Sequence, residues 1–376
     1  MAETGRITVC AGPGKEFIIR EHELPKVEPN TALMKIEMCG LCGTDVHYWQ
    51  GHEPTIPLQW PGVMGHEFVG TLVEIGEGYY EQDALGKPLK VGDRVVPAPL
   101  VNSGFDFYQT FVNELVKDEN AAAYGHLGDG PPYHHGGYAE YLYLFLPNTL
   151  VYKTDLPPEV AVQLEPMSIA VNGINRIGIK PGEVVVVQGA GPIGLMNVAC
   201  AKLSGASKVI SVDMVPERLE MAKKLGADVA INIEEVPSAE DRVRLVHEES
   251  TGGYGADVVL QCVGVPAAVP EGIDYLRFGG RFCEQGHFAD SGTVEINPSL
   301  HLCAKLITLV GSWSSTPPTF VQALNLMERM DFPYGEVVTH RIPLERTTEG
   351  FKALATDKIL DGKAAIKIVT APWETS

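Results

Sequence analysis

A short stretch near the N-terminus of this 376-residue chain gathers side chains that can bind a metal and move a proton. It reads C-G-L-C-G-T-D-V-H-Y-W and places a thiol, a hydroxyl, a carboxylate and an imidazole within six residues, at Cys42, Thr44, Asp45 and His47. A second stretch, P-G-V-M-G-H-E-F-V-G, adds an imidazole at His66 and a carboxylate at Glu67. A thiolate and an imidazole are typical zinc ligands, and a catalytic zinc takes three protein ligands with one position open.

Two other interpretations of these residues stay open at this point. Cys39 and Cys42 have the C-x-x-C spacing of a redox pair, although no thioredoxin-like unit surrounds them. Alternatively, Cys42 is a buried thiol and His66 a core histidine. The zinc hypothesis therefore depends on a third ligand further along the chain.

Glu165 is the candidate for that ligand. It lies inside the run P-P-E-V-A-V-Q-L-E-P-M-S-I-A-V-N-G-I, whose apolar residues recur at helical spacing. Its neighbours Val162, Leu164 and Ile169 are apolar, and a carboxylate is costly to bury without a partner. This favours a paired or metal-bound Glu165 over a solvated one.

A third pattern indicates a dinucleotide site. In V-V-V-V-Q-G-A-G-P-I-G, a β-branched strand meets a G-x-G-x-x-G turn, and a helix follows. The first glycine allows the tight turn, the second allows close approach of a pyrophosphate, and the third allows the helix to pack on the strand. Asp213 ends the next strand and lies where an acid can bind the ribose hydroxyls. The candidate residues are Gly189, Gly191, Pro192, Ile193, Gly194 and Asp213.

The elements that must position these residues form two domains. Short alternating runs with glycine turns predict a β-rich, barrel-like domain before the helix that contains Glu165. Strands and helices then alternate over about 180–312, which predicts a doubly wound α/β domain with a six-stranded, mostly parallel sheet. We expect the tail to pack back on the first domain. The predicted domains are 1–165 with 313–376, and 166–312.

Composition narrows the class of partner. The formal net charge of −19 disfavours nucleic acid and anionic membranes. Seven cysteines in a chain of this length do not form a disulfide framework, and their odd number fits a reducing compartment. The N-terminus lacks the apolar core of a signal peptide, and the most apolar stretch is interrupted by Gln188, Pro192 and Asn197. We therefore expect a cytoplasmic protein.

These motifs, in this order, resemble the zinc-dependent medium-chain alcohol dehydrogenases over essentially the whole chain. V-G-D-R-V, G-G-Y-A-E-Y and G-A-D-V-V-L-Q-C-V-G add to the matching segments already quoted. The resemblance implies a GroES-like barrel domain and a Rossmann domain. It also implies that Cys42 and His66 bind a catalytic zinc, that Asp45 supports His66, and that Thr44 and His47 form a proton relay. The resemblance further implies that the cofactor is contacted by Arg218, Val263 and Lys367.

The sequence departs from the common family pattern in two places. Glu165 stands where the third ligand is often cysteine, which is similar to sorbitol dehydrogenases; either Glu67 or Glu165 is then the direct ligand, with the other bound through water. No cysteine occurs between Cys42 and Cys200, so we expect one zinc per chain and no structural zinc. Asp213 predicts NAD rather than NADP. A homodimer or homotetramer is expected by resemblance.

The resemblance, with Glu165 at the third ligand position, implies that the substrate is a secondary alcohol, or the ketone in reverse. The segment that replaces the cysteine lobe, within the loop-like 97–135, is aromatic, and Tyr48 and Trp49 flank the zinc motif. Its rings are Phe105, Phe107, Tyr108 and Phe111. We expect them to line the site, which predicts a bulky or cyclic alcohol as the substrate. If they only form packing or a subunit interface, a polyol substrate remains. A zinc-free reductase of the same superfamily and a non-catalytic dinucleotide-binding protein are the other classes considered. His134 and His135 are predicted to be solvated loop residues.

Overall fold

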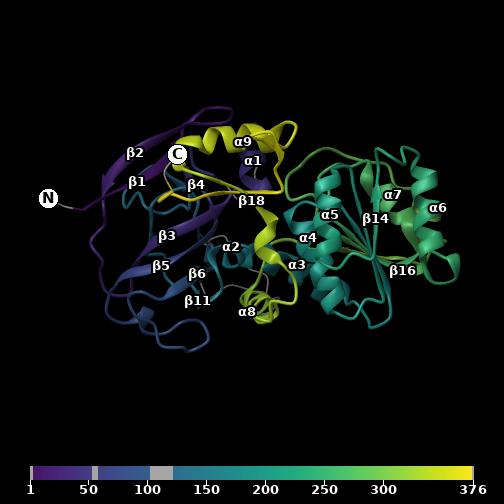
Figure 1. Cartoon of the computed structure of the whole chain (residues 1–376), viewed down its shortest axis with the longest axis horizontal. Helices are drawn as coiled ribbons and strands as arrows, with labels where there is room; N and C mark the ends of the chain where they lie inside the picture. Colours follow the sequence, from purple (N-terminus) through teal and green to yellow (C-terminus); the bar gives the residue numbers. More distant parts are fainter. Residues whose placement is uncertain (1–2, 53–57, 102–121, 375–376) are drawn as a thin grey trace. The chain divides into compact units, whose positions relative to one another are not determined.

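The structure is a computed structural model that describes residues 3–52, 58–101 and 122–374. It divides into two compact units (Figure 1). The first unit comprises Met1–Glu165, Thr316–Phe320 and Val338–Ser376, and the second comprises Pro166–Ser315 and Val321–Val337. The sequence-based boundary put all of 313–376 in the first domain. The structure instead groups most of this segment's helix, α8 (Pro317–Met327), with the second unit.

The first unit is built on two antiparallel-rich sheets. The smaller has the order β2-β1-β4-β9, formed by β1 (Thr4–Cys10), β2 (Phe17–Glu23), β4 (Gly62–Met64) and β9 (His126–Gly128). The larger has the order β11-β6-β5-β3-β21-β18, with β10 also paired to β3. Its strands are β3 (Ala32–Gly40), β5 (Glu67–Ile75), β6 (Arg94–Pro97), β10 (Tyr141–Leu144), β11 (Val151–Lys153), β18 (Val338–Ile342) and β21 (Lys367–Thr370).

Strand pairing brings the two ends of the chain together in this unit. β21 pairs with β3, with Thr370 opposite Cys39 and Val369 opposite Gly40. The smaller elements are β7 (Leu100–Val101), β8 (Ala122–Ala123), β19 (Ile359–Leu360), β20 (Lys363–Ala364), α1 (Gly43–Gln50), α2 (Pro158–Ala161), α9 (Thr347–Ala355) and the 3₁₀ turns Tyr79–Glu81 and Leu344–Arg346. One buried apolar cluster, which includes Ile36, Phe68 and Tyr138, fills the interior of this unit.

The prediction of solvated histidines at His134 and His135 is wrong. Their exposed fractions are 0% and 2%. The backbone explains the burial, because the carbonyl of His134 accepts from the amide of Tyr143 at 2.7 Å and that of His135 accepts from Gly125 at 2.8 Å. These bonds hold the segment against β10 and the start of β9 instead of leaving it in solvent.

The second unit contains the predicted six-stranded parallel sheet, which is confirmed. Its order is β14-β13-β12-β15-β16-β17, and all pairs are parallel. The strands are β12 (Val184–Gln188), β13 (Lys208–Asp213), β14 (Val229–Asn232), β15 (Ala256–Gln261), β16 (Leu276–Glu284) and β17 (Thr308–Gly311). β12 is buried along its whole length, as expected for a β-branched strand in the middle of a parallel sheet.

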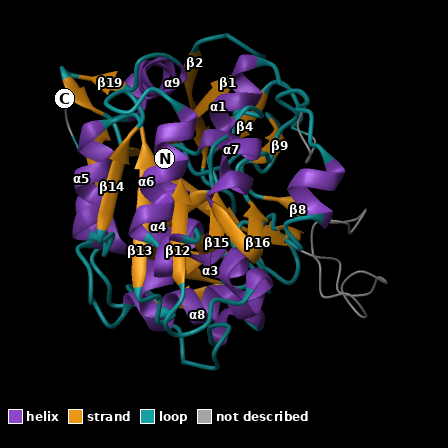
Figure 2. Cartoon of the chain, turned by 90° about the vertical axis from the view of Figure 1, so that its right-hand side faces the viewer, coloured by secondary structure: helices purple, strands orange, loops and turns teal. Residues whose placement is uncertain are grey.

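Helices cover this sheet, which Figure 2 shows with β14, β13, β12, β15 and β16 side by side. The helices of this unit are α3 (Leu164–Ile177), α4 (Pro192–Leu203), α5 (Pro216–Lys224), α6 (Ala239–Glu249), α7 (Ala268–Tyr275) and most of α8. It also contains 3₁₀ turns at Thr251–Gly253 and Tyr334–Val337 and a π-helical turn at Pro298–Cys303. Within the described ranges, none of the helices has the length and apolar character needed to cross a membrane.

Candidate metal and cofactor sites

Cys42 is positioned by the start of α1. It is the N-cap residue of this helix, and its sulfur accepts a hydrogen bond from the amide of Thr44 at 3.4 Å. Helix N-termini favour negative charge, which suits a thiolate. Burial and Glu67 nevertheless raise the pKa of the Cys42 thiol, while His66 and Lys367 lower it. A cation at this position would shift the balance toward the thiolate.

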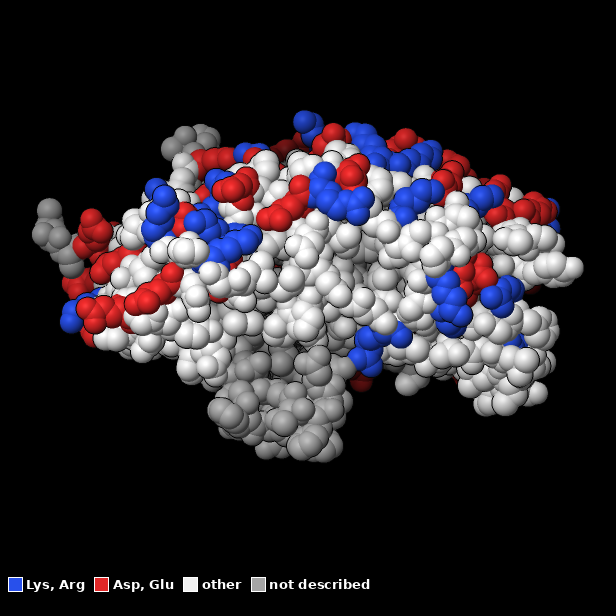
Figure 3. All heavy atoms as spheres, turned by 90° about the horizontal axis from the view of Figure 1, so that it is seen from below, with Lys and Arg blue, Asp and Glu red and all other residues white. Residues whose placement is uncertain are grey.

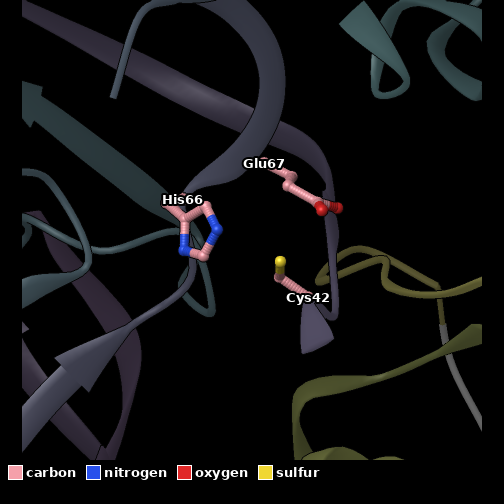
Figure 4. Close-up of side chains that lie close together, drawn as sticks. All are labelled: Cys42, His66 and Glu67. Carbon is pink, nitrogen blue, oxygen red and sulfur yellow. The ribbon is translucent and has the colours of Figure 1, made fainter. Parts of the chain in front are cut away.

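His66 lies in the turn between β4 and β5, Glu67 is the first residue of β5, and both side chains face Cys42. Ligand atoms of Cys42, His66 and Glu67 all lie within 4.8 Å of one another. Figure 4 shows the three side chains directed at one shared space, with one ring nitrogen of His66 turned toward the other two. Among the described residues, this is the one group of histidine, cysteine and acidic side chains that meets such a distance limit.

Asp45 contacts the far side of the His66 ring. The Nδ1 of His66 lies 3.4 Å from the Oδ1 of Asp45, and the Asp45 side chain is fully buried. Burial lowers the pKa of His66, but Asp45 and Cys42 outweigh it and raise this pKa well above its usual value. The structure thus gathers negative charge around His66, which leaves Nε2 as the nitrogen on the side of Cys42.

Lys367 lies beside the same group. Its buried ammonium forms an ion pair with the Oε2 of Glu67 and donates to the carbonyl of Leu41 at 3.3 Å. Gly40 makes this pair possible, because a Cβ there would come within 2.0 Å of the Glu67 Oε2. The family resemblance assigned Lys367 to the cofactor, and that role stays a prediction. The structure of the first unit places its side chain against the metal-binding group.

Glu165 lies at the start of α3 and is buried, with an exposed fraction of 9%. Burial raises its pKa to about 7 and Glu67 adds to the shift, whereas His66 and Lys367 lower it. Glu165 therefore interacts electrostatically with the metal-binding group, although its oxygens lie outside the group that meets the 4.8 Å limit.

The predicted proton relay residues lie on α1, next to Cys42. Thr44 is half-buried in the first turn and His47 is half-buried in the last turn. The Nδ1 of His47 lies 2.6 Å from the Nδ1 of His52. Burial, with a further contribution from His52, lowers the pKa of His47. This favours a neutral imidazole that can accept a proton near neutral pH.

The residues of the first unit fit a zinc ion. A thiol, an imidazole and a carboxylate are its usual protein ligands, and Cys42, His66 and Glu67 bring one of each to a single buried place. Asp45 supplies the carboxylate that commonly orients a metal-binding histidine. A dense set of buried acidic groups beside a thiol is costly unless a cation balances it. Lys367 balances part of that charge, and zinc would balance the rest.

The second unit contains the predicted glycine turn between β12 and α4. Gly189 has a φ of +95°, which glycine adopts without strain. A Cβ on Gly194 would come within 1.8 Å of the Gly189 carbonyl, and one on Gly189 would come within 2.7 Å of Val263. α4 has Gly191 as its N-cap and Pro192 as its first residue, so free amides at its N-terminus can face a phosphate.

Asp213 lies at the C-terminal end of β13, beside this turn. Its carboxylate accepts from the amide of Ala190 at 2.6 Å and from that of Val215 at 2.9 Å. These bonds fix the carboxylate next to Gly191. Arg218 lies on α5 near the same turn, since its Nη1 would be 3.9 Å from a Cβ on Gly191. Burial lowers the pKa of Arg218 and Asp213 opposes that shift.

Two buried residues near the metal-binding group were not singled out by the sequence analysis. His126 on β9 has its ring 5.4 Å from that of His66 and edge-on to Tyr48. Burial, aided by His66, lowers its pKa to about 4. Tyr138 donates to Asp45 at 2.6 Å. Tyr138 belongs to the quoted G-G-Y-A-E-Y motif, whereas no sequence signal indicated His126.

The aromatic residues that suggested an apolar pocket are only partly described. The rings at Phe105, Phe107, Tyr108 and Phe111 lie outside the described residues. Tyr48 is buried against His126, and Trp49 packs on Phe351 and donates to the Lys15 carbonyl at 2.7 Å. Both flanking rings therefore contribute to packing.

Families of known proteins match segments in both units of the chain. The alcohol dehydrogenase GroES-like domain family matches residues 28–155, and the zinc-binding dehydrogenase family matches residues 192–329. The chain is 31% identical to an erythritol/L-threitol dehydrogenase of Mycolicibacterium smegmatis, over 98% of each chain, and 31% identical to a sorbitol dehydrogenase of Gallus gallus, over 94% of each. A solved alcohol dehydrogenase of Thermotoga maritima superposes with a TM-score of 0.90 at 28% identity, covering 98% of this chain and 100% of that one.

Proposed function

Because the chain belongs to the zinc-dependent medium-chain alcohol dehydrogenase family, we propose that it oxidises a secondary alcohol to a ketone with NAD, and that it catalyses the reverse reduction. The observation that carries this proposal is the convergence of Cys42, His66 and Glu67 beside Thr44 and His47. Zinc and a nicotinamide cofactor, when bound, supply a Lewis acid that acidifies the alcohol and an acceptor for its hydride.

The residues of this chain hold the zinc and move the proton. Cys42 and His66 would bind zinc directly, with Asp45 fixing the ring of His66. Thr44 would accept the hydroxyl proton of the alcohol, and the neutral imidazole of His47 would carry it toward solvent. Since His47 already contacts His52, its proton can leave the site along the outer end of α1.

Each chain is proposed to hold one zinc. The third protein ligand is Glu67 or Glu165; the ion pair with Lys367 occupies the Oε2 of Glu67, which leaves Oε1 for direct binding to the metal. Elemental analysis of metal-replete protein should give close to one zinc per chain. Glu67→Gln and Glu165→Gln measured side by side should identify the direct ligand as the one whose loss releases more zinc. Two zinc ions per chain, with one retained in Cys42→Ala, would contradict the proposal.

NAD is proposed as the preferred cofactor because of Asp213. Its carboxylate is fixed by two backbone amides near Gly191, so it can accept from ribose hydroxyls and repel a 2′-phosphate. Arg218 lies near the same turn and tempers this repulsion. Steady-state kinetics with both cofactors test the assignment, which a preference for NADP in the unmodified enzyme would overturn. Asp213→Gly should shift the preference toward NADP.

A polyol is the substrate class that the relatives favour. The erythritol/L-threitol, sorbitol and D-xylulose enzymes that the chain resembles all bear names of polyhydroxylated compounds. The prediction of a bulky or cyclic alcohol depended on rings outside the described residues and stays a prediction. Comparing kcat/KM for erythritol, xylitol and sorbitol with that for a cyclic secondary alcohol decides between them. A clear preference for the cyclic alcohol would overturn the polyol assignment.

Self-association is proposed through the edge of the six-stranded sheet. β17 is the last strand of that sheet and is largely exposed. Four large apolar side chains of this region are at least 47% exposed: Phe278, Leu300, Leu306 and Leu309. Exposed apolar clusters beside an unprotected strand edge commonly form interfaces. A second copy of the chain is the proposed occupant, and sedimentation of Leu309→Lys against the unmodified protein should show a shift toward monomer.

Charge on the visible surface is mixed. On the face that Figure 3 shows, acidic and basic side chains lie interspersed. Because the chain as a whole is acidic, an anionic cofactor would depend on a local site such as the Gly189–Gly194 turn.

A further inference from the structure

Tyr138 occupies an unusual place beside the metal-binding group. Its side chain is fully buried, and its hydroxyl lies 2.6 Å from the Oδ2 of Asp45 and 3.3 Å from the carbonyl of Gly40. The single hydroxyl proton is therefore best placed for Asp45. A hydrogen bond to a buried carboxylate is stronger than one between neutral groups.

Backbone hydrogen bonds from Tyr138 and its neighbour Gly137 hold the turn that carries His66. The amide of Tyr138 donates to the carbonyl of Met64 at 3.1 Å, and the amide of Gly137 donates to that of Gly65 at 2.8 Å. Gly65 has a φ of +96°, and a Cβ there would come within 2.9 Å of Tyr138. Tyr138 thus contacts both parts of the site: the helix that carries Cys42 and Asp45, and the turn that carries His66.

A chain of polar contacts runs from this phenol to the candidate ligand. The Tyr138 hydroxyl donates to the Oδ2 of Asp45, whose Oδ1 lies 3.4 Å from the Nδ1 of His66. A carboxylate in this position sets the tautomer and the ring orientation of a metal-binding histidine. The carboxylate can do this only if its own rotation is restricted, and Tyr138 restricts it from the opposite side.

We propose that Tyr138 is a positioning residue for the zinc site, which acts by holding Asp45 in the orientation that fixes His66. The inference rests on the proposed binding of zinc at Cys42 and His66. Tyr138 also packs edge-on against Phe17 and Phe351, so it contributes to the core in any case. The two roles separate in Tyr138→Phe, which keeps the ring and removes only the hydroxyl.

The experiment compares Tyr138→Phe with a matched variant. Tyr143 is also buried in the first unit, and its hydroxyl lies 3.1 Å from two acceptors, the Lys26 carbonyl and the Thr31 hydroxyl. Tyr143→Phe therefore removes a comparable hydroxyl away from Asp45. Zinc release from each holoenzyme into a chelator is followed with time. Tyr138→Phe should release zinc about 10-fold faster, as expected for loss of an outer partner, and Tyr143→Phe should match the unmodified protein.

A second readout reports the ligand geometry directly. In the cobalt-substituted proteins, the visible absorption bands should shift in Tyr138→Phe and stay unchanged in Tyr143→Phe. If Tyr138→Phe released zinc at the same rate as the unmodified protein and had the same cobalt absorption bands, the inference would be overturned, even if its thermal stability fell. An unmodified protein that takes up no zinc would instead contradict the proposed zinc site itself.

A comparison in the Asp45→Ala background keeps the test decisive if Tyr138→Phe alone does not fold because Asp45 loses its donor. Asp45→Ala removes the buried carboxylate, so the phenol has no route to His66 through it. Zinc release from Asp45→Ala and from the double variant with Tyr138→Phe should then agree within about two-fold, the spread expected for uncoupled sites. A clear further acceleration in the double variant would show that Tyr138 acts on the site in another way.

Discussion

The metal-binding group of the first unit depends on side-chain charge, whereas the glycine turn of the second unit depends on backbone geometry. The glycine turn works through backbone: amides at the start of α4 face the ligand, and Gly189 and Gly194 leave space that side chains would fill. The metal-binding group works through buried side chains whose charges must balance, with Lys367 against Glu67 and Asp45 against His66. One site therefore tolerates few changes of shape, and the other tolerates few changes of charge.

The largest expected effect is on the charged site. Cys42→Ala should lower alcohol oxidation by more than about 10³-fold, because Lewis-acid catalysis supplies several kcal/mol of transition-state stabilisation. NADH binding, followed by its fluorescence, should change little because the glycine turn belongs to the other unit. If the variant also lost NADH binding, the two sites would not be independent and the contrast between them would fail.

A smaller effect is expected at the relay. His47→Gln should slow oxidation near neutral pH by about 10²-fold, the lower end of general acid–base assistance. Because the pKa of His47 is lowered, the unmodified enzyme should keep its rate down to a pH below about 6.5, the usual value for histidine, and lose it as His47 becomes protonated. Full activity of His47→Gln across the pH range would show that His47 takes no part in proton transfer.

The glycine turn offers a comparison within itself. Gly194→Ala should lower the free energy of unfolding by about 1–3 kcal/mol, since its Cβ overlaps the Gly189 carbonyl. Gly191→Ala meets only Arg218 at 3.9 Å, so it should leave the midpoint of thermal unfolding nearly unchanged while weakening NADH binding. Equal loss of stability in both variants would show that the turn is fixed by something other than backbone space.

The smallest effect concerns a buried group outside both sites. Burial lowers the pKa of His134 to about 4, while its unfolded value is about 6.5. The unfolded chain therefore binds more protons between these values, and stability present above pH 6.5 is lost as the pH falls toward 4. When the pH is lowered from 7.5 to about 5, the free energy of unfolding of His134→Asn should fall by about 2 kcal/mol less than that of the unmodified protein. Half-exposed His301, as His301→Asn, is the control, and equal acid sensitivity would contradict the assignment.

The same contrast explains what the sequence could predict. The strand, turn, helix and Asp213 of the dinucleotide site follow one another within one continuous segment, so local pattern was enough. Cys42, His66 and Glu165 were singled out because their side chains are distinctive in their sequence surroundings. The partners that complete their electrostatics, Tyr138 and Lys367, come from distant segments of the chain. Only the pairing of β21 with β3 brings Lys367 to Glu67. The burial of His134 likewise depends on tertiary contacts that no local pattern records.

The position of β21 has a consequence for how the protein is made. Lys367 reaches the carbonyl of Leu41 from 326 residues further along the chain, and its strand fills a place in the sheet beside β3. During synthesis the second unit is complete before that strand leaves the ribosome, so it can fold while the first sheet still lacks a member. We expect nascent chains that end before Lys367 to expose an open strand edge next to Cys42, and metal loading to follow release of the finished polypeptide.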